Sequence, residues 1–162
     1  MDPRDALVVR AAVEDLAAAY CDAVTRADAD DFGSCWAADA TWVIPGTGEV
    51  VGRNAIVEQF ATTRANYDLC IQELLSGRVA VDIDGHRAEG RWYVRELQHT
   101  ADRVGGELLG IYDDVVTLDG DRWRFARRGF HLLYRGRLEM PGRVYRLPSR
   151  WPPSAAGSSE HS

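Results

Sequence analysis

Residues 108–134 predict a long antiparallel hairpin, which constrains the fold more than any other part of the chain. Both halves of this segment are rich in β-branched and aromatic residues, the composition typical of strands. Between them lies Asp119-Gly120-Asp121, whose glycine can supply the positive φ that a tight turn requires. The two strands of this hairpin are therefore expected to complete a sheet.

The register of this hairpin decides which side chains share a face. A two-residue turn at Asp119-Gly120 would place Tyr112 beside Arg127, whereas a three-residue turn would place it beside Arg128. A slip of one residue exchanges the two faces of a strand completely. In either register, the face that turns inward carries a tyrosine and an arginine.

The length of 162 residues fits one domain that can bury a core without disulfides or metals. We expect this single domain to span residues 1–149. Beyond it the chain is rich in Pro and Ser, which predicts a disordered tail over residues 150–162.

The charge balance argues against nucleic acid and anionic membranes as partners. The chain has 25 acidic and 19 basic residues and a net charge of −6, and all the basic residues are arginines. Without lysine, neither a Schiff base nor the lysine of a phosphate-binding loop is available. No apolar run approaches the roughly 20 residues that span a bilayer, and the N-terminus lacks a secretory signal pattern, so we expect a cytoplasmic protein.

The cysteines and histidines show no metal-ligand spacing. Cys21, Cys35 and Cys70 are widely separated and contain no Cys-x-x-Cys pair, so they are expected to be reduced and buried. The four histidines are equally scattered, and no metal site is predicted.

Three helices are predicted in the first part of the chain. Apolar residues recur at helical spacing over residues 5–25, and carboxylates at Asp28, Asp30 and Asp31 are typical of the capped start of a short helix that reaches Trp36. A third helix is expected over residues 54–65, with Asn54 as a possible cap.

Strands dominate the remainder. A short strand over residues 40–44 ends at a glycine-rich turn over residues 46–52, which lacks the residues of a phosphate loop. Further strands are predicted over residues 70–76, 78–83 and 88–98, before the hairpin. Helices followed by antiparallel strands predict an α+β fold, in which a strongly curved sheet wraps around the helices and encloses a blind pocket.

Several loosely spaced motifs resemble the SnoaL-like family of the nuclear transport factor 2-like superfamily. They include Cys35-Trp36-Ala37-Ala38-Asp39-Ala40-Thr41-Trp42, Gly90-Arg91-Trp92-Tyr93 and Asp119-Gly120-Asp121-Arg122-Trp123. The resemblance implies a cone-shaped α+β barrel with a mixed or antiparallel sheet, a homodimer, a small-molecule substrate and no cofactor. Members include polyketide cyclases, dehydratases, dehydrochlorinases, epoxide hydrolases and ketosteroid isomerases, as well as binding modules without activity.

The dehydratase and dehydrochlorinase members of that family use an Asp on the first helix and a His on the first long strand. In this sequence the two positions are Thr25 and Gln72. An amide has no basicity near pH 7, and threonine cannot stabilise an imidazolium. The resemblance therefore does not carry the His-driven elimination over to this chain.

The resemblance and the strand alternation together give the candidate site. The proposed catalytic residues are Tyr20, Gln72, Tyr112 and Arg128, and the proposed substrate-binding residues are Trp36, Trp42, Arg91, Tyr93, Phe130 and His131. Each has a structural alternative. The two tryptophans can belong to the core, Arg91 and Tyr93 can lie at the sheet rim with acidic partners, and regular alternation turns His131 away from Arg128.

Three functions are consistent with this site. The first is a cofactor-independent cyclase, isomerase or dehydratase acting on a small polyketide-like or polycyclic metabolite, with Asp113, Glu73 or Asp28 as candidate bases. The second is a binding or assembly module without turnover, and the third is ring opening of an epoxide. A buried carboxylate within hydrogen-bond reach of Arg128 or Tyr112 that also contacts an open cavity would favour an enzyme, whereas an interior filled by Trp and Phe side chains would favour a binding or structural role.

Overall fold

The computed structural model describes residues 2–82, 84–100, 102 and 104–145, which form three helices and six strands. The helices are α1 (Pro3–Arg26), α2 (Ala29–Ser34) and α3 (Arg53–Arg64). The strands are β1 (Trp36–Ile44), β2 (Gly48–Val51), β3 (Tyr67–Val81), β4 (Arg87–Thr100), β5 (Gly105–Asp119) and β6 (Arg122–Arg137). The predicted tail over residues 150–162 lies outside the described residues.

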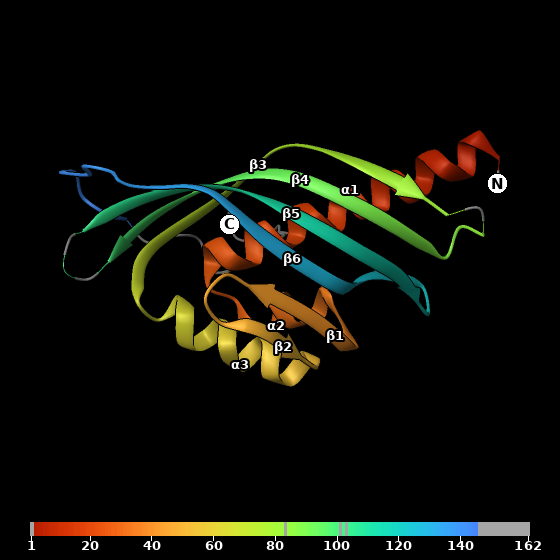
Figure 1. Cartoon of the computed structure of the whole chain (residues 1–162), viewed down its shortest axis with the longest axis horizontal. Coiled ribbons are helices and arrows are strands. Elements are labelled where there is room, and N and C mark those ends of the chain that lie inside the picture. The colour runs from red at the N-terminus through yellow and green to blue at the C-terminus, as the bar shows by residue number, and fades with distance from the viewer. Residues whose placement is uncertain (1, 83, 101, 103, 146–162) are drawn as a thin grey trace, which may run out of the picture.

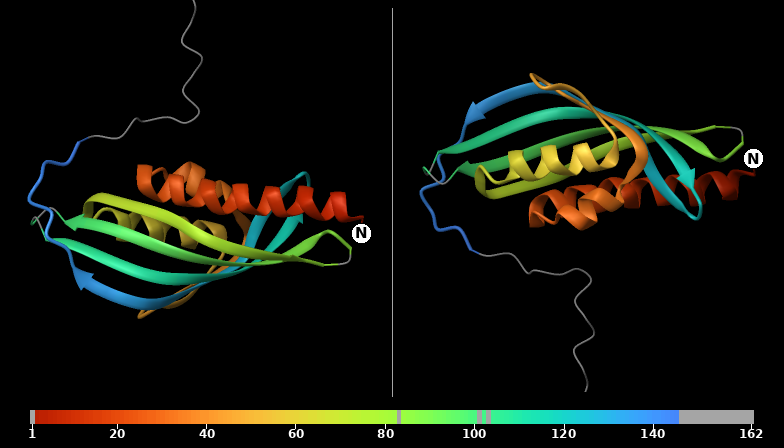
Figure 2. Two further views of the ribbon diagram at one scale, coloured as in Figure 1. Left: turned by 90° about the horizontal axis from the view of Figure 1, so that it is seen from above. Right: turned by 90° about the horizontal axis from the view of Figure 1, so that it is seen from below.

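The strands form one curved, open sheet in the order β2-β1-β6-β5-β4-β3. The pairing of β1 with β6 is parallel and the other pairings are antiparallel, so the sheet is mixed. Figures 1 and 2 show α1 and α3 on the concave side, where the sheet curls around them. The predicted α+β cone is thus confirmed, although the sheet does not close into a barrel. No helix in the described ranges is long and apolar enough to cross a membrane.

The predicted central hairpin is present as β5 and β6, but neither expected register is correct. Asp119 pairs with Arg122, so the turn residues are Gly120, at φ +65°, and Asp121. An extra residue then interrupts β6 between the partners of Val115 and Val116, and Tyr112 consequently pairs with Phe130. A bulge of this kind cannot be read from the turn alone, because it lies several residues away from it.

Several element boundaries also differ from those expected from the sequence. Residue 36 begins β1 instead of ending the second helix, and the glycine-rich turn contains the short strand β2. The cap of α3 is Gly52, with no side-chain cap, instead of Asn54. The two strands predicted before residue 83 are one strand, β3, with a register shift between Leu74 and Ser76.

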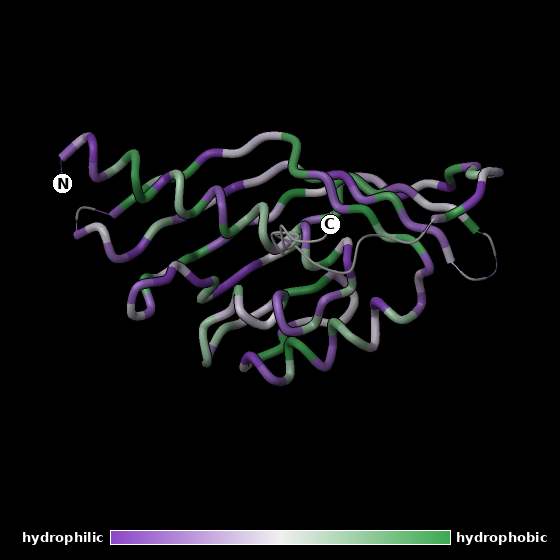
Figure 3. The backbone as a smooth tube through the Cα atoms, turned by 180° about the vertical axis from the view of Figure 1, so that it is seen from behind, coloured by the Kyte–Doolittle hydropathy of each residue, from purple (hydrophilic) through white to green (hydrophobic). Residues whose placement is uncertain are grey.

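An aromatic cluster fills the space between the helices and the sheet. Phe32 stacks on Phe60 with ring centroids 3.9 Å apart, and Trp36 contacts Phe125 at 5.4 Å. Tyr20 from α1 contacts Phe32 at 5.1 Å. Figure 3 shows hydrophobic and hydrophilic residues alternating along much of the sheet, as expected when one face is buried and the other faces outward.

A buried ion pair lies beside this cluster. Arg128 Nε and Nη2 donate to the two carboxylate oxygens of Asp114 at 2.8 and 2.7 Å, and both side chains are fully buried. Asp114 also accepts a hydrogen bond from Trp92 Nε1 at 2.8 Å. Burial raises the pKa of the Asp114 carboxyl above its usual value, and Arg128 offsets part of this rise. The pair thus satisfies charges that would otherwise be costly inside the protein.

Three aromatic rings surround the guanidinium of this pair. Its Cζ lies 4.2 Å from the ring centre of Tyr20, 4.1 Å from that of Tyr112 and 3.9 Å from that of Phe125. Such cation–π contacts are strongest where water is excluded. Arg128 therefore links α1, β5 and β6 through its stacking contacts as well as its ion pair.

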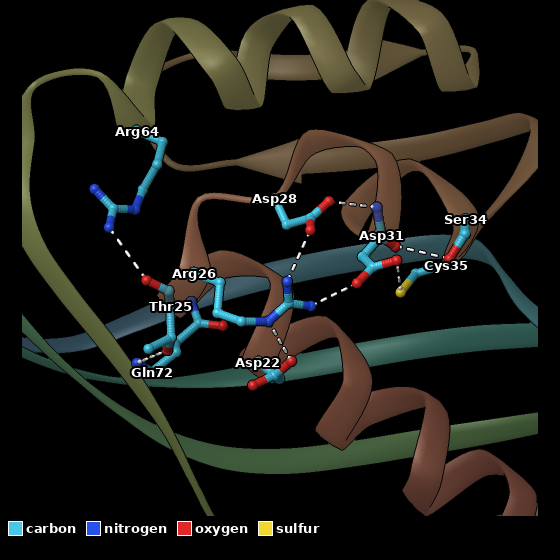
Figure 4. Close-up of polar contacts among 9 residues, drawn as sticks. All are labelled: Asp22, Thr25, Arg26, Asp28, Asp31, Ser34, Cys35, Arg64 and Gln72. Atoms are coloured by element: carbon cyan, nitrogen blue, oxygen red, sulfur yellow. Dashed lines mark hydrogen bonds and ion pairs between the residues drawn. The ribbon is translucent and has the colours of Figure 1, made fainter. Parts of the chain in front are cut away.

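A second charged group of residues fixes the corner between α1 and α2 (Figure 4). Arg26 binds the carboxylates of Asp22, Asp28 and Asp31 at 2.7, 2.7 and 2.5 Å. Asp28 is also the N-cap of α2 and accepts from the backbone N–H of Asp31 at 2.9 Å. The capping role expected for these acidic residues is confirmed for Asp28.

Replacing Asp28 should change the acid sensitivity of the fold. The Asp31 N–H, and with it Arg26, lowers the pKa of Asp28 below its usual value of 3.8. Its contribution is therefore present above that pH and is lost as the pH falls through the lowered folded-state pKa. We expect Asp28→Asn to lower the melting temperature at pH 6, and the difference from wild type to shrink below about pH 4. The exposed Asp30→Asn is the control, and an unchanging difference for Asp28→Asn would contradict the assignment.

Removing one partner of the buried pair should be much more costly than removing its neighbour. Asp114→Asn leaves the Arg128 charge uncompensated, and we expect the free energy of unfolding to fall by about 3–5 kcal/mol. Asp113→Asn removes an ion pair with Arg91 on the exposed face, which should cost less than about 1 kcal/mol. Urea denaturation of both variants measures this difference, and equal losses would rule out the special role of the buried pair.

Candidate functional site

A cavity of about 170 Å³ lies on the concave face of the sheet, where α1 and α3 face strands β1, β3, β4, β5 and β6. Much of its wall is apolar or aromatic, from residues Val24, Trp42, Ile44, Pro45, Phe60, Leu108, Phe130 and Leu132. The polar wall consists of Tyr20, Thr63, Arg64, Tyr67, Cys70, Gln72, Glu96, Gln98, Tyr112 and Arg135. A concave pocket that combines apolar and aromatic walls with polar groups is typical of small-molecule sites.

Glu96 is the only carboxylate among the described residues that line this cavity. Gln72 Nε2 donates to its Oε2 at 2.6 Å, and Gln98 Nε2 donates to its Oε1. The same Gln72 amide donates to the Tyr112 hydroxyl at 3.0 Å. Both carboxylate oxygens of Glu96 are thus held in place by amide groups, and the chain of hydrogen bonds continues to a buried phenol.

The alternation along β4 explains why Glu96 faces the cavity. Trp92 and Val94 are buried against the core, and Glu96 and Gln98 follow at the same two-residue spacing. Gly90 leaves room for the large indole of this row, since a Cβ there would lie 2.9 Å from Trp92 Nε1. The inner face of β4 therefore changes along its length from an indole to a carboxylate.

Two tyrosines form the inner end of the cavity. The rings of Tyr20 and Tyr112 meet edge to face with centroids 5.7 Å apart, and both are nearly fully buried. Burial raises the pKa of both phenols above their usual values, while the nearby Arg128 lowers them in part. Both hydroxyls therefore stay protonated near neutral pH and can donate hydrogen bonds.

Among the predicted catalytic residues, three lie on the cavity wall and one lies behind it. Tyr20, Gln72 and Tyr112 line the cavity, whereas Arg128 is fully buried against Asp114. The predicted inward-facing pair of a tyrosine and an arginine is thus present. The expectation that Arg128 lies open to a ligand is wrong, because its guanidinium is stacked between rings and bound to the carboxylate.

The predicted substrate-binding residues divide between the two faces of the sheet. Trp42 and Phe130 line the cavity, and Trp36 is fully buried in the aromatic cluster. Arg91, Tyr93 and His131 lie on the outer face. Arg91 Nε binds Asp113 at 2.7 Å, and His131 Nε2 lies 3.2 Å from the same carboxyl group. The expected placement of these three residues in the pocket is wrong, because Trp92 occupies the inner face of β4 and Phe130 that of β6.

The carboxylates first considered as bases also lie elsewhere. Asp113 faces outward as described, Glu73 pairs with Arg95 at 3.5 Å on the same face, and Asp28 caps α2. Glu96 and Gln98, which do line the cavity, are not among the site residues predicted from the sequence. Residues two apart on a strand share a face, so Glu96 and Gln98 could have been assigned to the cavity if Trp92 had been recognised as an inner residue of β4.

Thr25 at the end of α1 and Gln72 on β3 lie in contact. Thr25 Oγ1 accepts a hydrogen bond from the backbone N–H of Gln72 at 3.1 Å (Figure 4). Arg64 binds the backbone carbonyls of Val24 and Thr25 at 3.0 and 3.2 Å and closes the end of α1 at this point. The end of α1 is therefore joined to the first long strand by hydrogen bonds to a backbone N–H and to backbone carbonyl groups.

The thiols offer no activated nucleophile. Burial raises the pKa of Cys21 and of Cys35 to about 11, and it raises that of Cys70 as well. Thiols with such pKa values are protonated at neutral pH and react slowly. Among the described residues, no group of three or more His, Cys, Asp or Glu side chains is arranged to hold a metal ion.

Solved structures with the same fold include enzymes of several kinds. One is the hexachlorocyclohexane dehydrochlorinase LinA-type3 from Novosphingobium barchaimii, with 19% identity over 91% of this chain and 100% of that chain, and a TM-score of 0.78. Another is a provisionally assigned scytalone dehydratase from Novosphingobium aromaticivorans, with 17% identity over 92% and 99% of the two chains, and a TM-score of 0.78. At these identities the likeness shows the fold alone.

A provisionally assigned aromatic ring hydroxylase from Novosphingobium aromaticivorans is similar at 25% identity, over 82% of this chain and 94% of that chain, with a TM-score of 0.75. A comparison with curated protein sequences finds no match. The model of the SnoaL-like domain matches residues 5–129, which is most of the chain. The chain therefore belongs to the SnoaL-like domain family.

Proposed function

We propose that the protein is a cofactor-independent lyase or isomerase in which Glu96 accepts a proton from a small organic substrate. The observation that carries this proposal is the position of Glu96, the only carboxylate among the described residues of an otherwise largely apolar cavity wall. A positioned carboxylate acting as general base contributes about 10²- to 10⁴-fold to a rate. Glu96 thus takes the role that a histidine has in the related dehydratases and dehydrochlorinases.

Gln72 and Gln98 orient the base. Each donates to a different oxygen of Glu96, so that the carboxylate cannot rotate freely. A fixed carboxylate reacts with a properly placed C–H group without first losing rotational freedom. Gln72 therefore keeps the catalytic importance predicted for it, as a positioning residue.

Tyr20 and Tyr112 are the proposed hydrogen-bond donors to the substrate. The Tyr112 oxygen accepts from Gln72, and its hydroxyl group also interacts with that of Tyr20. A donor directed at an oxygen that gains negative charge in the transition state is worth about 3 kcal/mol. Arg128 supports both phenols through their rings and is a positioning residue in this scheme.

The proposed reaction begins with the breaking of a C–H bond beside a substrate carbonyl group. The proton moves to the Glu96 carboxylate, and the electron pair moves to the carbonyl oxygen, where the phenols stabilise it. Return of the proton to another carbon gives isomerisation, whereas its transfer to a β-hydroxyl that departs as water gives dehydration. A small cyclic ketone of the polyketide type fits this chemistry. Attack of the enolate carbon on a second carbonyl carbon of the substrate, whose oxygen then takes the proton from Glu96, would give cyclisation.

Binding without turnover is the second candidate. The family resemblance implies an Asp–His dyad where this chain has Thr25 and Gln72, and aromatic rings fill much of the interior. These observations favour a module that captures a ligand. Epoxide opening ranks third, because it needs a water molecule held between an acidic and a basic group. Among the described residues, the only such ion pair beside the cavity is Arg128–Asp114. Both of its side chains are fully buried.

Replacing the base should abolish proton transfer but not folding. We expect Glu96→Gln to lower the rate of deuterium incorporation from D₂O into enolisable cyclic ketones, or of water loss from β-hydroxy ketones, by at least about 100-fold. Nuclear magnetic resonance detects both reactions. Glu107→Gln, which removes an outer-face carboxylate paired with Arg95, is the matched control and should keep the wild-type rate.

The same compounds separate the three candidate functions. Wild-type turnover that Glu96→Gln does not reduce would rule out Glu96 as the base. Opening of added epoxides without ketone exchange would favour the third function. Ligands that raise the melting temperature without any conversion would instead identify a binding module.

We further propose that the outer face of the sheet forms a homodimer. Tyr93 and Tyr134 are 45% and 50% exposed there, and Ile111 and Leu109 are their respective partners on β5. The ion pairs of Arg91 and Arg95 surround these apolar side chains. Apolar residues with a charged border are typical of an interface between subunits.

A charge introduced into this face should prevent association. We expect the wild type to sediment as a dimer and Tyr134→Asp as a monomer, because a buried unpaired carboxylate is costly. Analytical ultracentrifugation measures both. Val51→Asp alters an exposed apolar residue on β2 and should remain dimeric. A monomeric wild type would refute the interface.

A further inference from the structure

Arg135 reaches the cavity because β6 contains a second irregularity. Gly110 pairs with Leu132, and Leu109 pairs with Tyr134, so Leu133 is the extra residue of a bulge. Beyond it, Arg135 pairs with Leu108, whose side chain is buried on the inner face. Without the bulge, simple alternation from Leu132 would have turned Tyr134 inward and Arg135 outward.

The charge of Arg135 is not used by the fold. It is exposed, lines the cavity, and forms no ion pair with any residue in the part of the chain that the structure describes. Arg64, the other arginine of the cavity wall, differs because backbone carbonyls occupy its guanidinium. Arg135 is therefore a cation at the mouth of the cavity that is available to a ligand.

Glu96 and Arg135 give the cavity opposite charges on its wall. Both act on Tyr67: burial raises the pKa of this phenol most, the negative charge of Glu96 raises it further, and the positive charge of Arg135 lowers it in part. A ligand with a negative group would be repelled by Glu96 and attracted by Arg135. Such a ligand can bind in one orientation only, with its anion at the mouth and the rest of the molecule beside Glu96.

The cavity volume limits what lies beside the base. A protein cavity of about 150 Å³ lined by apolar residues holds one benzene molecule. The volume here is about 170 Å³. One six-membered ring therefore fills the apolar part, and a substrate with two or more fused rings would require the walls to move.

We propose that the substrate is a single-ring carboxylate, whose carboxylate binds Arg135 and whose ring lies against Glu96. A guanidinium matches a carboxylate with two parallel hydrogen bonds, which favours this anion over a neutral polar group. The binding mode stands on the cavity and on Arg135. Only the statement that the bound molecule reacts rests on the proposed function.

Binding of benzoate and of its neutral analogue benzamide tests the proposal directly. Isothermal titration calorimetry of the wild type should give a dissociation constant at least tenfold lower for benzoate. Arg135→Gln should lose this preference. Arg127→Gln removes another exposed arginine of the same strand, which is not among the residues of the cavity wall, and should retain it. Equal binding of the two compounds by the wild type, or equal effects of the two variants, would overturn the proposal.

Two further titrations test ring size and orientation. We expect 2-naphthoate to bind at least tenfold more weakly than benzoate, and tighter binding would overturn the single-ring limit. Glu96→Gln should bind benzoate as well as or better than the wild type, because a like charge is removed. Weaker binding by this variant would show that the carboxylate lies at Glu96, against the proposed orientation.

These measurements separate the two proposals. Loss of the benzoate preference in Arg135→Gln does not depend on any turnover, so it can be observed even if Glu96 is not a base. Conversely, a fall in proton transfer in Glu96→Gln can be observed with neutral ketones, whether or not Arg135 selects an anion. Failure of one proposal therefore leaves the other standing.

Discussion

The ion pair between Arg128 and Asp114 is the interaction on which the interior depends. Two opposite charges in a dry aromatic core are stable only if each finds its partner, so the pair admits little variation in geometry. It brings together β4 through Trp92, the central hairpin through the two charges, and α1 through the ring of Tyr20. The inner faces of these strands are fixed relative to the helix as a result.

The cavity exists because the inner residues of the strands become smaller and more polar with distance from the buried ion pair. At one end, Trp92 and the ion pair fill the space between sheet and helix, and no room remains for a ligand. Further along β4 the inner residues are Glu96 and Gln98, which are smaller and polar, and the sheet curves away from α1 toward α3. The ligand site therefore begins where the packed core ends, and its inner end consists of the same phenols that contact Arg128.

The sequence was sufficient for the fold and for part of the site. Helical spacing located α1 and α3, turn residues located the central hairpin, and the inward tyrosine and arginine of that hairpin were predicted as a pair. Tyr20, Gln72 and Tyr112 do line the cavity. The predictions failed where a bulge interrupted strand alternation, and where the wrong face of a strand was taken as the inner one. On β4 the inner face was expected to carry Arg91, but it carries Trp92. Glu96 lies on the same face as Trp92 and was therefore not predicted as a base. Alternation gives the grouping of residues by face, but packing of the largest side chain decides which group is inside.

The extra residue at Leu133 has a consequence for comparing related chains. Between the two bulges of β6 the even-numbered residues face inward, and after the second bulge the odd-numbered residue Arg135 does so. Where a relative lacks such an extra residue, an ungapped alignment would match cavity residues of one protein with surface residues of the other. A single gap at this position therefore decides whether conserved residues at the mouth of the cavity can be recognised in an alignment. Ligand preference could also diverge at this position without any change in the residues around Glu96.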